Sequence, residues 1–155
     1  MSASIVDAVS LWANRVREDL PPEARRLRPN EQTVAEAAGV THVSDVRIVI
    51  VDGMPRPDDP LLAALCDRYG FLGERTLGLT LGHAIFLTPQ VAENVEILAH
   101  ECCHVAQVEQ FGSVRSFVRQ YIKELIEYGY AFAPLELEAT RTGRCLSGPG
   151  NTAWR

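Results

Sequence analysis

Apolar residues recur at helical spacing in several separate stretches of the chain. In the first, apolar side chains stand three or four positions apart from Ile5 to Leu20, and two prolines then end the run. Later stretches begin with residues that favour helix starts, such as Asp59-Pro60 and Ser113, or end at a glycine. The pattern predicts helices over residues 2–20, 30–38, 60–69, 89–111, 114–126 and 134–143.

Two other stretches have the composition of strands. "DVRIVIVDG" (45–53) is rich in β-branched residues, which predicts a buried strand, and "RTLGLTLGHAIFLTP" (75–89) predicts two short strands joined near Gly82-His83. The basic stretch "EARRLRP" (23–29) is typical of a solvated turn. Together these elements predict an α+β fold with a small sheet. We expect a single domain over residues 1–143, followed by a flexible tail over 144–155.

Composition and charge exclude several classes of protein. The 155-residue chain has a net charge of −5, whereas a nucleic-acid-binding protein normally has a basic face, so we expect no nucleic-acid partner. No apolar run approaches the roughly 18 residues that cross a bilayer, and the N-terminus lacks the pattern of a signal peptide, so we expect no membrane partner. The four cysteines, two of them adjacent, do not fit a disulfide framework, which favours a cytoplasmic location.

The stretch "ILAHECCHVAQVEQFG" (97–112) contains the main candidate chemistry. His100 and His104 are four residues apart, so on a helix their imidazoles lie one turn apart and can reach one metal ion. Glu101 is rotated by about 100° from His100 and suits a general base acting on water beside that ion. Apolar positions such as Leu98 and Cys102 fall on the opposite side of the helix, which therefore packs through one face.

The alternative is an ordinary packing helix that happens to contain two histidines. Chance produces H-E-x-x-H in about one in a hundred chains of this composition, and the motif holds two of the chain's four histidines. We therefore favour a metal site. Imidazole and carboxylate ligands with one open position are typical of catalytic zinc.

A third ligand has to come from elsewhere in the chain. The metzincin pattern fails, because position 107 is glutamine where that pattern has glycine. His42 and His83 are alternatives, although each is more typical of a loop or turn. Glu136 and Glu138 fall in the first turns of the last predicted helix, from which a carboxylate can reach the histidines.

The motif "HECCHVAQ" followed by "YGYAFAPLELEA" resembles the short bacterial gluzincin-like proteins, which carry H-E-x-x-H-x-x-Q and then P-x-E-x-E-A. The resemblance covers about residues 76–143. It implies a minimal zincin-like domain, with a small sheet packed against several helices and the metal motif on a long central helix. It also implies that His100, His104 and Glu136 bind Zn²⁺ and that Glu101 activates water, with Glu138 as the alternative ligand. Related proteins often have an acidic residue where this chain has Thr140, and that residue orients a histidine.

The expected function is that of a zinc metallopeptidase, a hydrolase acting on a peptide or protein substrate with Glu101 as general base. The alternative is a zincin-like module that keeps its metal for stability or partner binding without catalysis. Three tyrosines, Tyr121, Tyr128 and Tyr130, are candidates for stabilising an oxyanion. Because no second domain is evident to form the far wall of a cleft, we expect no deep substrate pocket.

Overall fold

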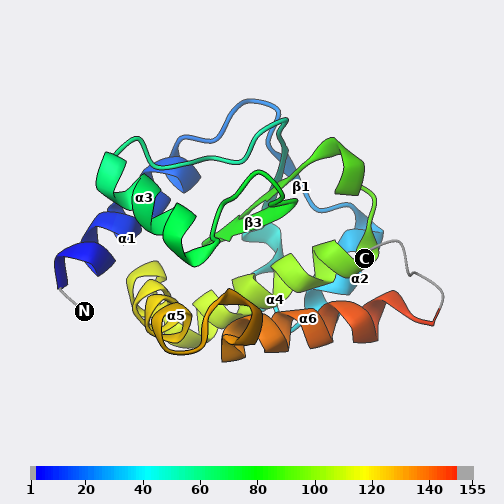
Figure 1. Ribbon diagram of the computed structural model, residues 1–155. Coiled ribbons are helices and arrows are strands. Elements are labelled where there is room, and N and C mark those ends of the chain that lie inside the picture. The colour runs from blue at the N-terminus through cyan, green and yellow to red at the C-terminus, as the bar shows by residue number, and fades with distance from the viewer. Residues whose placement is uncertain (1–2, 150–155) are drawn as a thin grey trace.

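The computed structural model of the protein describes residues 3–149 and is drawn in Figure 1. In that range six α-helices accompany a four-stranded sheet, so the predicted α+β class is confirmed. The helices are α1 (Ala3–Glu18), α2 (Pro29–Ala37), α3 (Pro60–Tyr69), α4 (Val95–Phe111), α5 (Val114–Tyr128) and α6 (Pro134–Ser147). The strands are β1 (Arg25–Arg26), β2 (Arg47–Ile50), β3 (Gly78–Leu81) and β4 (Ala84–Leu87). None of the helices within residues 3–149 is long and apolar enough to cross a bilayer.

The sheet has the strand order β1-β2-β4-β3. β2 and β4 are parallel, whereas β3 and β4 form an antiparallel hairpin whose turn contains Gly82 at a positive φ of 62°. The two strands predicted within residues 75–89 and the strand predicted within 45–53 are therefore confirmed. β3 lies at one edge of the sheet, where its outer backbone groups have no strand partner among the described residues.

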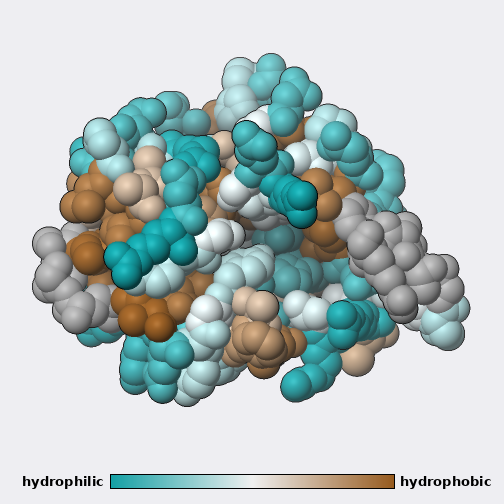
Figure 2. Space-filling view, viewed as in Figure 1, coloured by the Kyte–Doolittle hydropathy of each residue, from teal (hydrophilic) through white to brown (hydrophobic). Residues whose placement is uncertain are grey.

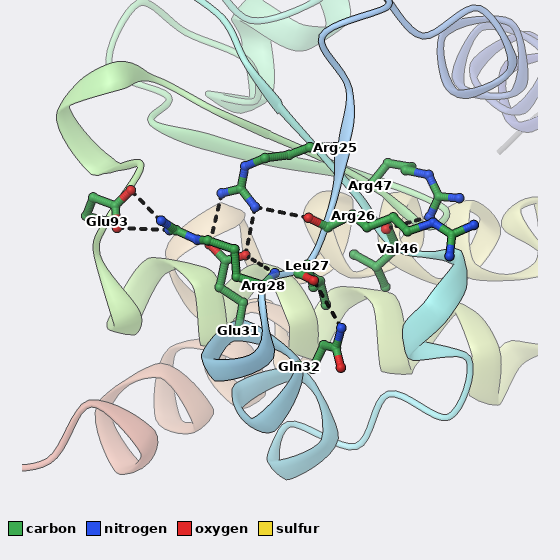
Figure 3. Close-up of polar contacts among 9 residues, drawn as sticks. All are labelled: Arg25, Arg26, Leu27, Arg28, Glu31, Gln32, Val46, Arg47 and Glu93. Atoms are coloured by element: carbon green, nitrogen blue, oxygen red, sulfur yellow. Dashed lines mark hydrogen bonds and ion pairs between the residues drawn. The ribbon is translucent and has the colours of Figure 1, made fainter.

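The stretch predicted as a solvated turn contains the edge strand β1. Figure 3 shows why this arginine-rich stretch is ordered: the side chains of Arg25 and Arg28 both bind the carboxylate of Glu31, at distances down to 2.8 and 2.7 Å. Arg28 also pairs with Glu93, just before α4. Burial alone would raise the pKa of Glu31, but hydrogen bonds from the two arginines lower it to about 2. A buried carboxylate thus holds β1 against the start of α2.

Alternate residues of β2 and β4 face two hydrophobic clusters, as the twofold repeat of a strand requires. Val49 and Phe86 face the cluster formed with α1, α3 and α5, whereas Ile48 and Ile85 face the cluster formed with α2 and α4. α4 contacts α2, α5, α6 and β3. Every residue of α4 from Leu98 to Val108 except His100 is consequently buried.

The structure differs from the sequence-based expectation for α4. Rather than packing through one face only, α4 is also covered on its histidine side by α6, and Figure 1 shows the two helices side by side. Their close approach depends on Gly143, where an added Cβ would lie 2.6 Å from the backbone oxygen of Glu96. The helix that carries the motif is therefore enclosed rather than half exposed.

The bounds of the long helix and of the last helix differ most from the prediction. The long helix begins after Asn94, whose side chain accepts a hydrogen bond from the backbone N–H of Ile97, and Pro89–Val91 forms a separate 3-10 turn. The last helix continues through residues 144–147, where the tail was expected to begin. The remainder of the predicted tail, from residue 150 onward, lies outside the described residues.

Candidate metal centre

The packing of α6 on α4 brings Glu136 to the two histidines of the motif. The Nε2 atoms of His100 and His104 lie 3.2 Å apart. Each also lies 3.2 Å from a carboxylate oxygen of Glu136, His100 from Oε2 and His104 from Oε1. The three side chains predicted as metal ligands thus converge and form a group that could hold a metal ion.

The spacing of these atoms fits a small tetrahedral ion. Nitrogen and oxygen ligands lie about 2.0–2.1 Å from zinc, and a tetrahedral angle then separates neighbouring ligand atoms by about 3.3 Å. The two Nε2 atoms, 3.2 Å apart, agree with this value, and each has one of the two carboxylate oxygens of Glu136 at the same distance. Two imidazoles and one carboxylate also leave one tetrahedral position open, as catalytic sites require.

Gln107 fixes the orientation and tautomer of His104. The side-chain nitrogen of Gln107 donates to the backbone oxygen of Leu135, at 3.0 Å, and to Oε2 of Glu138, at 2.7 Å. Because both of these partners are acceptors only, the amide oxygen has to face Nδ1 of His104, 2.8 Å away. Nδ1 therefore carries the proton and donates to Gln107, which leaves Nε2 directed at Glu136 and available to a metal ion.

The same network separates the roles of the two glutamates that the sequence left open. Glu136 lies against the histidines, whereas Glu138 accepts the hydrogen bond from Gln107 and is not part of the ligand group. Position 140 is threonine, and the side chain that contacts Nδ1 of His104 is instead a glutamine on the motif helix itself. The spacing of three residues between His104 and Gln107 was visible in the sequence, but its role needed the position of α6.

The electrostatics of the group are those of a buried ion pair. Burial alone would lower the pKa of His104, but the negative charge and hydrogen bond of Glu136 raise it to about 9. Burial conversely would raise the pKa of Glu136, and the two histidines hold it well below its usual range. The phenol of Tyr121 donates a 2.6 Å hydrogen bond to Oε1 of Glu136. In the absence of metal, a proton on His104 therefore balances the carboxylate.

Glu101 is held by strand β3. The hydroxyl of Thr80 lies 2.7 Å from Oε2 of Glu101 and 3.0 Å from its backbone oxygen. A Cβ added to Gly78 would lie only 2.6 Å from Oε1, so the carboxylate occupies space that only glycine leaves free. Gly78 and Thr80 are site residues that the sequence did not single out, although glycine in a strand indicates a close approach.

A cleft of about 600 Å³ leads to the histidines and Glu101. Apolar side chains from α1, α3, α5 and the loop before β3 form most of its walls, among them Trp12, Leu62, Phe71, Leu72, Phe117 and Val118. Figure 2 shows hydrophobic residues gathered on the side of the molecule where α1, α3 and α5 lie. The expectation that the chain lacks a deep pocket is wrong, because α1 and α3 form the far wall of the cleft within the same domain.

The three candidate tyrosines have different positions. Tyr121 is buried and bonded to Glu136, while Tyr130 lines the cleft and remains 43% exposed. Partial burial, together with the charges of Glu136 and Glu101, raises the pKa of Tyr130, so its phenol keeps its proton and can donate a hydrogen bond. Tyr128 is 48% exposed and is not among the residues that line the cleft.

In comparisons with known proteins, no family model, curated protein or solved structure matches this chain.

Proposed function

We propose that the protein is a zinc-dependent peptidase of the zincin type. The observation that carries this proposal is the convergence of His100, His104 and Glu136 at a cleft that Glu101 also lines. The two Nε2 atoms lie 3.2 Å apart, and each lies 3.2 Å from one of the carboxylate oxygens of Glu136. Two imidazoles and a carboxylate are a common set of catalytic zinc ligands. The likeness of the two sequence motifs to gluzincin-like proteins supports the same assignment.

In this proposal the residues of the site have separate roles in hydrolysis. A zinc ion held by the three ligands would supply Lewis acidity, polarising a peptide carbonyl and lowering the pKa of a water molecule towards about 7. Glu101 takes a proton from the attacking water and passes it to the leaving amine. Tyr130, protonated and lining the cleft, donates a hydrogen bond to the carbonyl oxygen as negative charge develops there.

The cleft also suggests how a substrate binds. All four residues of β3 line it, and β3 is an edge strand, so an extended peptide can add to the sheet through backbone hydrogen bonds. The apolar walls from α1, α3 and α5 then favour peptides with large apolar side chains beside the bond to be cleaved.

The four cysteines, all described and all free, support a reducing compartment such as the cytoplasm.

The second candidate function is a metal-binding module without catalysis. The observation that favours it is the burial of Glu101, which is 5% exposed and hydrogen-bonded to Thr80. A carboxylate held in this way can serve to fix β3 on α4. It would then contribute to the fold and not to a reaction.

The test compares wild type with Glu101→Gln and His100→Ala on a peptide library, with zinc content measured for each protein. Loss of a general base typically costs 10²–10⁴-fold in rate, so Glu101→Gln should lose cleavage while its zinc is retained, and His100→Ala should lose both. Equal cleavage by wild type and Glu101→Gln would contradict the proposal. Zinc binding with no cleavage by wild type would favour the module.

A further inference from the structure

A second group of metal-binding side chains lies at the far end of the motif helix. Glu109 is in the last turns of α4, His42 precedes a 3-10 turn at Val43–Asp45, and His83 is in the turn between β3 and β4. One ligand atom from each lies within 4.8 Å of the others. The chain has four histidines, and each belongs to one of two His-His-Glu groups.

Both imidazoles of this second group approach the same carboxylate oxygen. Nε2 of His83 lies 2.8 Å and Nδ1 of His42 lies 3.3 Å from Oε1 of Glu109. Ligands at about 2.0–2.1 Å from a transition-metal ion are separated by about 2.9 Å at a right angle and about 3.3 Å at a tetrahedral angle. The observed distances span these two values, so an ion can be bound with small side-chain movements.

The carboxylate is fixed in place by the backbone. The N–H of Thr41 donates to Oε2 of Glu109 at 2.7 Å, and the N–H of His42 donates to Oε1 at 3.0 Å. These two backbone hydrogen bonds hold both carboxylate oxygens of Glu109 in place beside the imidazoles. The carboxylate of Glu109 is therefore already oriented for an ion, and only the two imidazoles would have to move.

The surroundings of the group have opposing effects on the binding of a cation. The C-terminal end of a helix carries a partial negative charge, and the last turn of α4, which the structure describes in full, has no basic residue to balance it. His42 is 65% exposed, so water can reach the group and complete the coordination. A small neighbouring cavity is lined by His83 together with Arg17, Arg47 and Asp45, and the two arginines there weaken cation binding.

We propose that His42, His83 and Glu109 form a second site for a divalent transition-metal ion that prefers imidazole, with zinc as the ion expected. Its exposure and the nearby arginines make its affinity lower than that of the His100–His104–Glu136 group. An ion there joins three separate segments: the loop after α2, the β3–β4 turn and the end of α4. This inference does not depend on whether the protein is a peptidase.

The test is a titration of metal-free protein with Zn²⁺ and with Co²⁺, followed by equilibrium dialysis and by the visible spectrum of Co²⁺. Wild type should bind two ions, one tightly and one more weakly. His83→Ala and His42→Ala should each lose the weaker ion, with at least a tenfold fall in its affinity, and keep the tight one. Asp45→Asn is the matched control, because Asp45 lines the neighbouring cavity without belonging to the group, and it should keep both ions.

A complementary variant isolates the second site. His100→Ala combined with His104→Ala removes both imidazoles of the first group and should leave the weaker ion bound. Uptake of a single ion by wild type, or a weaker ion whose affinity is unchanged in both His83→Ala and His42→Ala, would overturn the proposal. His42 is exposed and His83 is partly exposed, so their substitution should leave the fold intact, and circular dichroism checks this.

Discussion

The side-chain oxygen of Gln107 lies 2.8 Å from Nδ1 of His104. The side-chain nitrogen of the same amide donates hydrogen bonds to Leu135 and Glu138 on α6. A single residue therefore sets the tautomer of a candidate ligand and ties the motif helix to the helix that supplies Glu136. Partners of this kind usually change metal affinity by 10–100-fold when they are removed.

Gln107→Leu is accordingly expected to weaken the binding of the tight zinc ion by about 10–100-fold. The leucine fills a similar volume but cannot accept from Nδ1, and it leaves Oε2 of Glu138 and the backbone oxygen of Leu135 without their donor. Competition with a chromophoric chelator measures the affinity. Glu138→Gln is the control, because it changes the partner on α6 and leaves the contact with His104 in place. A similar loss in both variants would mean that helix packing, and not histidine orientation, is responsible.

Gly78→Ala tests whether the position of Glu101 matters for turnover. The added Cβ would displace a carboxylate oxygen now 2.6 Å from that point, and Glu101 can move because its end is flexible. Small displacements of catalytic groups can cost about 10²-fold, so kcat/KM should fall by that order while zinc binding and the Tm change little. Gly53→Ala is the matched control, since a Cβ there has no neighbour within 4 Å. Unchanged activity in Gly78→Ala would argue against Glu101 as the base.

Tyr121→Phe and Tyr130→Phe should have different effects. Tyr121 donates a buried hydrogen bond to Glu136, so its loss is expected to lower zinc affinity about tenfold or more. Tyr130 lines the cleft, so its loss should lower kcat by about 10²-fold, as for other donors to an oxyanion, with zinc content unchanged. Steady-state kinetics and zinc titration of both variants separate the two effects. If Tyr130→Phe retains full kcat, Tyr130 is not the oxyanion donor.

Local sequence signals predicted much of the fold because they act over short distances. The helix at Pro60–Tyr69, the β3–β4 hairpin and the start of the last helix at Pro134 all follow from caps, prolines and apolar spacing. β1 was missed because its two residues are arginines, which lack the apolar or β-branched side chains typical of strands. Their order depends on Glu31, which is buried only after α2 docks.

The candidate site was predictable where its residues follow the repeat of a helix. His100, Glu101 and His104 share one helix, and a glutamate from the last helix was expected to join them. The contributions of Gly78 and Thr80 arise from contacts between β3 and α4, which no local pattern contains. Gln107 belongs to the local pattern H-E-x-x-H-x-x-Q, but its contact with Glu138 on α6 could not be predicted from that pattern. The pairing of His42 with His83 was missed for the same reason, since 41 positions separate them in the sequence.

Glu31 gives a stability prediction that does not involve either metal group. Its folded pKa of about 2 lies below the ordinary value of 4.5, so its contribution to folding is present above about pH 4.5 and is lost as the pH falls towards 2. Glu31→Gln keeps the shape of the side chain but removes charge-assisted hydrogen bonds from Arg25 and Arg28. The free energy of unfolding should fall by about 1.5–3 kcal/mol at pH 7.

The measurement is urea denaturation of metal-free wild type and Glu31→Gln at pH 7, 4 and 3. The difference between the two proteins should shrink as the pH falls below about 4.5, because Glu31 then takes up a proton in the unfolded wild type while its folded carboxylate stays ionised until about pH 2. Taking the difference cancels the titration of His104, Glu136 and Glu109, which is common to both proteins. Glu36→Gln on the exposed face of α2 serves as control and should change stability by less than about 0.5 kcal/mol at each pH. A difference between wild type and Glu31→Gln that stays constant from pH 7 to pH 3 would show that packing around residue 31, and not its charge, holds β1 in place.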